Sequence, residues 1–434
     1  MNILHLITSL KVGGAESALV NYLSKVVGQD GNTHSVAYFH LGPNVDKIRN
    51  LGVKTYQISG TLSIYDPVFF FRLAKLIQFI KPDVIHSSLW SANIIARLIS
   101  KFSKIPVICD LHGNSFDEGR VRNWFDRRTV KYCAKIVAVS NSVKDAYLKN
   151  IMTSELNKPA PSRRQRLWRA GCGECARSAR IDASAEATSE RRLEPSPNGR
   201  RAELQKNLVV IKNGIDVQAL RDKAFTEPLI RKNFGLFDDD FVIGAVGRLE
   251  PIKSYDVLIK AFASFCHPEL DSVSNAQAKL VIVGDGSQAA ALAALVKTLK
   301  IEKQVIFTGF RPDAYKFYQI FDCFALSSQS EGLSIALLEA MVFGLPIIST
   351  NLDISRHDVI TPGINGLLVR PNDIEGYARA INKLFQDRQE DRGLKHTMGK
   401  RNLELVGSEF CIDGVVDRYQ ALYQDVVQCY QLKK

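Results

Sequence analysis

The 434-residue sequence contains no hydrophobic run long enough to cross a membrane. A spanning helix needs about 20 apolar residues, and the most hydrophobic stretch, around residues 67–75, is interrupted by Arg72 and Lys75. The N-terminus lacks the basic start of a signal peptide and has the pattern of a buried strand instead. We therefore expect a chain that is not threaded through a membrane and that resides in the cytoplasm.

Cysteine is sparse: there are eight residues in the whole chain, and of these only Cys172 and Cys175 lie close together. Such scattering excludes a disulfide framework and favours reduced thiols. The close pair has the spacing of half a zinc site. No second pair of Cys or His follows at a suitable distance, so a zinc site is disfavoured.

Charge of either sign is moderate. The chain has 57 Lys and Arg against 45 Asp and Glu, a net charge of +12, and 46% of its residues are hydrophobic. This composition excludes disorder over most of the length, and the length suits two domains. A moderate positive excess favours a phosphate-rich partner or an anionic membrane surface without choosing between them.

One segment, residues 153–206, differs from the rest in composition. From Arg163 to Arg201 it has ten arginines, no lysine and a single aromatic residue, Trp168. It shows no sustained apolar period, so it offers no face to a core. We interpret it as an Arg-rich, disordered insertion, and we expect a smaller extra loop at 266–278. Nucleic-acid binding is disfavoured because the segment has too few aromatic side chains to stack on bases.

Outside the insertion, short apolar strands alternate with helices, which is typical of doubly wound parallel sheets. We predict strands at residues 3–7, 35–39, 84–86, 107–111, 136–140, 208–212, 241–246, 280–283, 305–307, 323–326 and 346–349. Helices are expected at residues 16–27, 68–80, 92–102 and 415–430. The fold class is therefore α/β with two Rossmann-like domains: 1–152 with 207–235, and 236–414, followed by a terminal helix in 415–434.

In such sheets ligands bind beyond the carboxyl ends of the strands. Arg248 and Lys253 follow the 241–246 strand, and two cations in one loop are suited to a diphosphate, although two solvated surface cations are the alternative. Gly284 follows the next predicted strand, in a Gly-x-Gly turn that allows close approach of a ligand. The turn lacks the third glycine of a dinucleotide fingerprint, so an NAD enzyme is disfavoured.

The most informative stretch runs from Glu331 to Glu339. We expect Glu331 at the start of a helix and Glu339 about two turns inside it, so that each carboxylate accepts hydroxyl hydrogens at one end of an extended ligand. The residues between them are Gly332, Leu333 and Ser334, whose free amides at a helix N-terminus suit a phosphate. The alternative is two ordinary helix residues, with Glu339 solvated.

Two first-domain features fall at the same edge of their sheet. Gly13 and Gly14 follow the first strand as a close-approach turn, and His112 follows the 107–111 strand. A histidine there is equally consistent with a structural and with a functional role. Asn213 and Gly214 have the pattern of an ordinary turn.

Together these motifs resemble the GT-B retaining glycosyltransferases of glycosyltransferase family 4. The resemblance covers nearly the whole chain except 153–206, and it rests on the order and spacing of the motifs. They are Gly13-Gly14-Ala15-Glu16, His112-Gly113, Asn213-Gly214-Ile215-Asp216, Gly247-Arg248-Leu249 with Lys253, Val305 to Phe310, and the E-x7-E motif from Glu331 to Glu339.

The resemblance implies two domains facing across a cleft, with the terminal helix crossing back to the first domain. It implies retaining transfer from a nucleotide-diphosphate sugar, with a UDP-sugar favoured, and no metal or other cofactor. The implied catalytic residues are Arg248 and Lys253 at the diphosphate, Glu331 at the sugar and His112 from the acceptor side. The implied donor-binding residues are Gly13, Gly14, Gly284, Phe310, Gly332, Leu333, Ser334 and Glu339, the last at the ribose.

The sequence departs from the family at two places. Ser254 stands where the family usually has glycine after the lysine, and the 351–359 segment lacks the usual Gly-Gly and Glu. Neither change removes a group to which we assign chemistry. A nucleotide-sugar isomerase or hydrolase of the same fold and a decayed, non-catalytic homologue are the alternative functions.

The family implies a polysaccharide, lipopolysaccharide or lipid-linked acceptor. A basic and aromatic stretch suits anionic headgroups at the cytoplasmic membrane face, but an ordinary half-buried helix explains it equally well. The stretch comprises Arg120, Arg122, Trp124, Phe125, Arg127, Arg128, Lys131, Tyr132 and Lys135.

Overall fold

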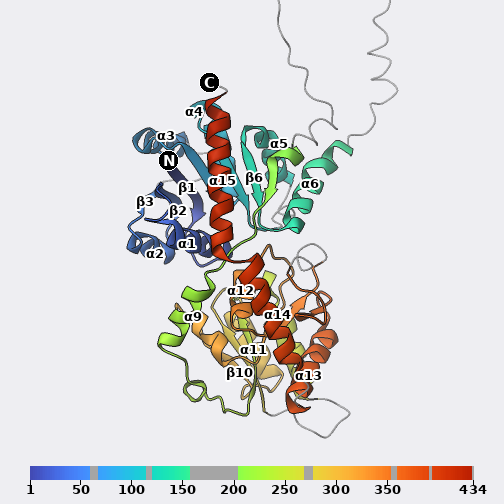
Figure 1. Ribbon diagram of the computed structural model, residues 1–434. Coiled ribbons are helices and arrows are strands. Elements are labelled where there is room, and N and C mark those ends of the chain that lie inside the picture. Colours follow the sequence, from blue (N-terminus) through green and yellow to red (C-terminus); the bar gives the residue numbers. More distant parts are fainter. Residues whose placement is uncertain are drawn as a thin grey trace, which may run out of the picture.

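The computed structural model describes residues 1–58, 67–113, 120–156, 204–267, 277–352, 359–390 and 393–432. Most of the insertion predicted at 153–206, including Cys172 and Cys175, lies outside the described residues, as do most of the 266–278 loop and most of the 351–359 segment. The described residues form two α/β domains, one above the other in Figure 1. No helix within these ranges is long and apolar enough to cross a bilayer.

The first domain has a parallel sheet of seven strands in the order β3-β2-β1-β4-β5-β6-β7. The strands are β1 (Asn2–Ser9), β2 (Thr33–His40), β3 (Lys54–Gln57), β4 (Val84–Ser88), β5 (Val107–Leu111), β6 (Lys135–Ala138) and β7 (Leu208–Val210). Every residue of β4 and β5 is buried, as expected for a parallel sheet covered on both faces. The helices are α1 (Gly14–Val26), α2 (Asn44–Asn50), α3 (Pro67–Ile80), α4 (Trp90–Ser103), α5 (Arg120–Thr129) and α6 (Asn141–Leu156).

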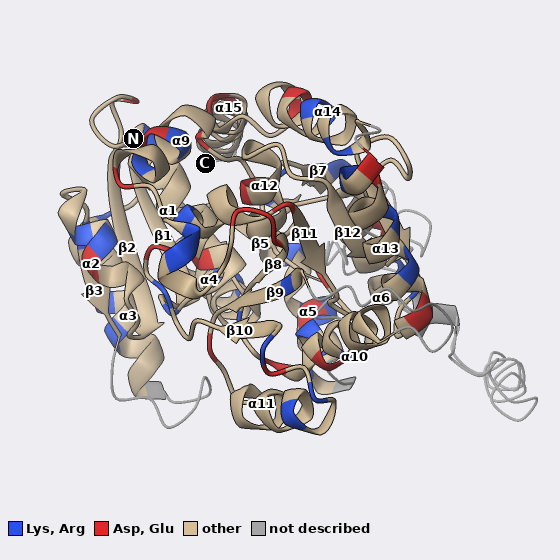
Figure 2. Ribbon diagram, turned by 90° about the horizontal axis from the view of Figure 1, so that it is seen from below, with Lys and Arg blue, Asp and Glu red and all other residues tan. Residues whose placement is uncertain are grey.

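The second domain repeats this plan with six parallel strands in the order β10-β9-β8-β11-β12-β13. They are β8 (Phe241–Val246), β9 (Ala278–Val283), β10 (Val305–Phe307), β11 (Cys323–Leu326), β12 (Ile347–Thr350) and β13 (Gly366–Val369). The helices include α10 (Tyr255–Cys266), α11 (Ala289–Thr298), α12 (Ile335–Val342), α13 (Ile374–Glu390) and α14 (Leu394–Glu409), with 3₁₀ turns η4 (Pro251–Lys253) and η5 (Ala314–Ile320). Figure 2 shows charged residues mainly on helices and loops, whereas the strands are largely uncharged.

The terminal helix α15 (Ile412–Gln431) leaves the second domain and packs on the first, against α1 and β4 (Figure 1). The chain crosses between domains at two adjacent points, where Ile215 pairs with Cys411 in a parallel bridge. A Cβ atom at Gly214 would lie 2.9 Å from Cα of Ile412. Glycine is needed there because the two crossing segments touch. The predicted terminal helix is confirmed.

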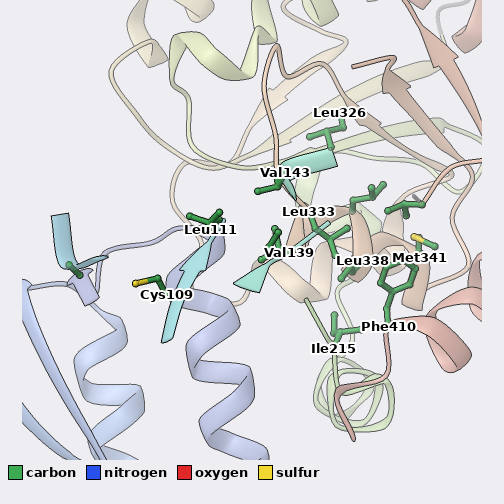
Figure 3. Packing of buried hydrophobic residues seen from close by; sticks show 14 of the residues in the cluster. Cys109, Leu111, Val139, Val143, Ile215, Leu326, Leu333, Leu338, Met341 and Phe410 are labelled. Carbon is green, nitrogen blue, oxygen red and sulfur yellow. The ribbon is translucent and has the colours of Figure 1, made fainter. Parts of the chain in front are cut away.

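Hydrophobic packing joins the two domains. One cluster of buried side chains contains Leu111 and Val139 from the first domain and Leu333 and Leu338 from the second. Figure 3 shows Val139 beside Leu333 at this junction. Because the cluster excludes water, it holds the carboxyl ends of the two sheets toward each other.

One part of the predicted domain division is wrong. Of the 207–235 segment assigned to the first domain, β7 pairs with β6, but α9 (Val217–Thr226) packs on η5 and α12 of the second domain. The chain therefore changes domain near Gly214. The helix α9 buries only Ala224 completely, so its own sequence carries little information about which sheet it covers.

Candidate active site

Three strands of the second sheet end in loops that glycines bring close together. A Cβ atom at Gly284, after β9, would lie 1.9 Å from the carbonyl oxygen of Gly247, after β8. The Gly284 amide donates to the carbonyl of Gly309, after β10, at 3.0 Å. Phe310 follows and is about half exposed. The structure thus brings Gly284 and Phe310 to one edge, beside the loop that carries Arg248.

At this edge Lys253 and Glu331 form an ion pair. Lys253 ends the η4 turn, and its Nζ donates to Oε1 of Glu331, which lies in the loop after β11. Oγ of Ser328 donates to the same carboxylate oxygen at 2.7 Å. The Lys253 and Glu331 side chains are 18% and 14% exposed, so water screens their attraction less than it would on an open surface. Arg248 is exposed in the neighbouring loop.

Ser254, the residue after Lys253, has an unfavourable backbone conformation. Ser254 has a φ of 49°, in the left-handed region that favours glycine. This is the position at which the family usually has glycine. The loop therefore keeps the conformation that glycine would allow, although a serine occupies the position.

The expectation that Glu331 begins a helix is wrong. The helix α12 begins at Ile335, and the Ser334 hydroxyl caps it by accepting from the Leu337 amide. Serine is a strong N-cap because its side chain satisfies a free amide of the first turn, so the helix begins after it. Gly332, Leu333 and Ser334 consequently form a packed loop, and the Leu333 carbonyl accepts from the Asn213 side-chain amide at 3.0 Å.

Glu339 lies in α12, where its side chain is half-buried rather than fully solvated. Its Oε2 accepts from the Tyr318 hydroxyl at 2.8 Å. Burial raises the pKa of Glu339 to about 7, and the bond from Tyr318 and the charge of Lys47 lower it only in part. Lys47 belongs to α2 of the first domain, so this carboxyl lies within electrostatic reach of both domains.

His112 meets the E-x7-E loop across the domain junction. A Cβ atom at Gly332 would lie 2.1 Å from the carbonyl oxygen of His112 and 3.3 Å from Cγ2 of Val139. Only glycine fits at 332 because the His112 backbone occupies that space. The structure therefore brings together His112 and the loop between Glu331 and α12, which are more than 200 positions apart in the sequence.

The Gly13-Gly14 turn lies at the start of α1, which contacts α12 across the junction. A Cβ atom at Gly13 would lie 2.3 Å from Oε2 of Glu16, whose other oxygen accepts from Ser9 at 2.6 Å. Gly14 has open space around its Cα atom. The turn reaches the junction, but no described contact joins it directly to Lys253 or Glu331.

Sequence reasoning did not identify three residues that support the site. Tyr318 and Ser328 bind the two glutamates, and Asn213, interpreted as part of an ordinary turn, binds the Leu333 carbonyl. Ser328 follows the predicted 323–326 strand, so the rule that ligands bind beyond strand ends could have identified it, as it identified Glu331. Nothing in the local sequence around Tyr318 indicates its partner, because Tyr318 lies in η5, 21 positions from Glu339.

Two family models match the chain, Glycosyltransferase Family 4 over residues 12–155 and Glycosyl transferases group 1 over residues 226–402. The first match lies in the first domain and the second extends over the sheet that carries Lys253 and Glu331. The chain belongs to the family 4 glycosyltransferases. It is therefore an enzyme, and the resemblance inferred from its motifs is confirmed.

Curated relatives of this glycosyltransferase act on several acceptors. The UDP-Gal:alpha-D-GlcNAc-diphosphoundecaprenol alpha-1,3-galactosyltransferase of Escherichia coli is 24% identical over 392 residues, 88% of this chain and 85% of that protein. The N-acetyl-alpha-D-glucosaminyl L-malate synthase of Bacillus anthracis is 28% identical over 223 residues, which span 51% of this chain and 55% of that protein. The chain thus matches only about half the length of the second relative.

Solved structures confirm the GT-B fold of the glycosyltransferase. The crystal structure of Anabaena HepE in complex with UDP-glucose has a TM-score of 0.73 and 20% identity, covering 98% of this chain and 100% of that chain. Sucrose-phosphate synthase from Thermosynechococcus elongatus has a TM-score of 0.70 and 17% identity, covering 99% and 100%.

Proposed function

We propose that this glycosyltransferase transfers the sugar of a UDP-sugar to a lipid-linked or glycan acceptor. The transfer retains the configuration of the anomeric carbon and needs no metal ion. The observation that carries the proposal is the Lys253–Glu331 pair, which adjoins Gly332, the residue that meets His112 at the domain junction. A cation for the diphosphate and a carboxylate for the sugar hydroxyls lie side by side there.

The bond between the anomeric carbon and the diphosphate oxygen breaks as the acceptor oxygen bonds to that carbon, and the acceptor proton passes to the departing diphosphate. Negative charge then grows on the departing diphosphate. Lys253 and the exposed Arg248 are the groups that stabilise it, which lowers the barrier because the positive charges are already in place. Glu331 orients the sugar through its hydroxyls, and Glu339 accepts from the ribose hydroxyls.

Metal independence is the part of the proposal that rests on the two donor-side cations, Arg248 and Lys253. Two cations at the donor edge take the place that a divalent ion would otherwise fill in neutralising a diphosphate. Retention is implied by the family, and the anomeric configuration of the product, read by NMR, tests it.

The preference for UDP and for a lipid-linked acceptor follows the relatives. The Escherichia coli enzyme, named for a UDP-sugar donor and a diphosphoundecaprenol acceptor, matches over most of both chains, and the HepE complex contains UDP-glucose. The malate synthase match spans only half of that protein, so a small hydroxy-acid acceptor is the weaker candidate.

A thermal-shift panel of UDP, GDP, ADP and their sugars tests the donor. We expect UDP and one UDP-sugar to stabilise the protein, and Glu339→Ala to abolish the shift. Lys260→Ala, on the exposed face of α10, is the matched control and keeps it. Stabilisation by GDP or ADP alone would overturn the UDP assignment, and release of free sugar with every acceptor tested would indicate a hydrolase.

We also propose that the first domain docks on an anionic membrane through α5. Val121 and Trp124 are 65% and 52% exposed, and the Arg128 guanidinium lies 5.5 Å from the Trp124 ring centre. An exposed aromatic beside a cation is suited to the headgroup region. Arg127 is half-buried and donates to the Asn150 carbonyl at 2.7 Å, so we do not assign it to the membrane surface.

Flotation with vesicles containing phosphatidylglycerol tests this surface. We expect Trp124→Ala with Arg128→Glu to reduce bound protein severalfold, because both the aromatic anchor and the charge are lost. Arg401→Glu, on the exposed face of α14 in the second domain, makes the same charge change and should bind like the wild type. Equal binding by the α5 variant would leave α5 as an ordinary half-buried helix.

A further inference from the structure

Beneath His112 the strands of the first sheet carry a buried polar cluster. Asp110, at the end of β5, has Oδ2 2.8 Å from Nε2 of His86 on β4, and the same oxygen accepts from the Tyr419 hydroxyl of α15 at 3.0 Å. His86 in turn lies 2.6 Å from the Tyr423 hydroxyl through Nδ1. All four side chains are more than nine-tenths buried. The crossing helix is therefore hydrogen-bonded to the strand that leads into the site.

Asp110 is charged although it is buried. Burial by itself would raise the pKa of its carboxyl, but the charge of His86 and the neighbouring ring of His112 outweigh burial and hold the pKa well below its usual value. The other titratable groups within electrostatic reach are His5 on β1, Tyr22 on α1, Tyr419 and Tyr423. None of these is a second carboxyl group, and the tyrosines are neutral phenols, so the carboxylate at 110 is the one buried anion of the cluster.

This anion lies next to the imidazole of His112. Nε2 of His112 is 3.7 Å from Oδ2 of Asp110, within ion-pair range but too long for a hydrogen bond. Within the part of the chain that the structure describes, neither ring nitrogen has a direct hydrogen-bond partner, and nor has Oδ1 of Asp110. A pocket of about 30 Å³ is lined by both residues, with Tyr22 and Ser88, and has room for a bridging water molecule.

We propose that Asp110 is a positioning residue for His112, and that α15 holds Asp110 in place through Tyr419. A fixed carboxylate favours the tautomer of a neighbouring imidazole that presents an N–H toward it, and it restrains the rotation of the ring. The inference rests on the proposed role of His112. It also assigns the C-terminal helix an indirect part in catalysis, because α15, which follows the crossing at Cys411, keeps His112 oriented through Asp110.

The alternative is that Asp110 only anchors α15, and kinetics on the full chain separates the two. Asp110→Asn keeps the shape of the side chain and removes its charge. With the UDP-sugar selected by the thermal-shift panel and UDP release as the assay, we expect at least a tenfold lower kcat and a KM within twofold of the wild type. If Asp110 acts through His112, Asp110→Asn combined with His112→Ala loses no more than His112→Ala alone. Losses that multiply, or an unchanged kcat for Asp110→Asn, would overturn the inference.

Two tyrosines of α15 supply a matched pair of controls. Tyr419→Phe removes the bond to Asp110 and should lower kcat two- to fivefold, and it should cause no further loss of kcat when combined with His112→Ala. This variant replaces Asp110→Asn in the test if Asp110→Asn does not fold. Tyr423→Phe removes the bond to His86 and the contact with Tyr22 but leaves the bond to Asp110 in place, and it should lower Tm while kcat stays within twofold. Equal kcat losses in the two tyrosine variants would point to anchoring alone. Full activity of His112→Ala would instead refute the role of His112 itself, which leaves the donor-side proposal intact.

Discussion

The two domains share one strand order but place their polar side chains differently. In the first domain, titratable residues such as His86 and Asp110 lie on the central strands and are buried. In the second, the central strands β8 and β11 are apolar, and the charged residues Lys253 and Glu331 lie in the loops beyond them. The comparison shows that the same architecture can hold site residues in two ways: through buried polar side chains on the strands, or through charged side chains in the loops that follow the strands.

The largest effect is expected where the buried polar contacts of the first domain are broken. Arg97 on α4 is fully buried, and its guanidinium lies 2.6 Å from Asp126 of α5. Arg97→Met leaves that carboxylate without its charge partner and should lower the free energy of unfolding by about 3–5 kcal/mol. Urea denaturation measures it. The double variant with Asp126→Asn should recover part of the loss.

The matched change in the second domain is Tyr377→Phe. Tyr377 is fully buried; its hydroxyl donates to the Leu326 carbonyl at 2.8 Å and also lies 2.7 Å from the Thr350 hydroxyl. Losing these neutral contacts should cost about 1–2 kcal/mol. Equal losses for Arg97→Met and Tyr377→Phe would contradict the contrast drawn between the two domains.

The loop site of the second domain should be sensitive in activity rather than in folding. Lys253→Ala removes the cation beside Glu331 and should lower kcat by about 10²–10³-fold, as expected when a preorganised charge is lost. Steady-state kinetics measures this, with Tm as a check on folding. Lys260→Ala, on exposed α10, should stay within twofold, and a similar loss there would mean that general charge is responsible.

A pH effect should come from Glu339, a half-buried carboxyl of the second domain. Its folded pKa is raised to about 7, so between the unfolded pKa and about pH 7 the folded state binds the proton more tightly. Stability should therefore fall as pH rises from about 4.5 to 7, by on the order of 2 kcal/mol, and level off above it. Denaturation at pH 5 and pH 7 measures this, and Glu339→Gln should flatten the slope. An unchanged slope would show that another group titrates there.

The smallest effect is expected at Ser254, whose φ is 49°. Ser254→Gly relieves the left-handed strain at the cost of a freer unfolded chain and should raise stability by about 0.5 kcal/mol. Gly235, with a φ of 69° and open space around it, gives the reverse control: Gly235→Ser should destabilise by about 1 kcal/mol. A loss of stability in Ser254→Gly would mean that its hydroxyl has a role that the strain argument omits.

The sequence analysis missed two strands, β3 and β13, which have four residues each and lie at sheet edges. β3 has no apolar run, because a half-exposed edge strand does not need one. β13 does have one, Leu367 to Val369, but so short a run cannot be told from a helical segment by its periodicity. The start of α12 was predicted too early, at Glu331, because Ser334 was counted as part of the helix and in fact caps it.

By itself the sequence determined the two parallel sheets and the terminal helix, and it singled out the residues that we propose bind the donor. These depend on local patterns: buried runs, turns after strands, and the spacing of Arg248, Lys253, Glu331 and Glu339. Only the tertiary structure decided which groups meet. It paired Lys253 with Glu331, placed Gly332 on His112, and joined Asp110 to a helix 309 positions away. Such contacts arise when packing excludes water between distant segments, and no local pattern encodes them.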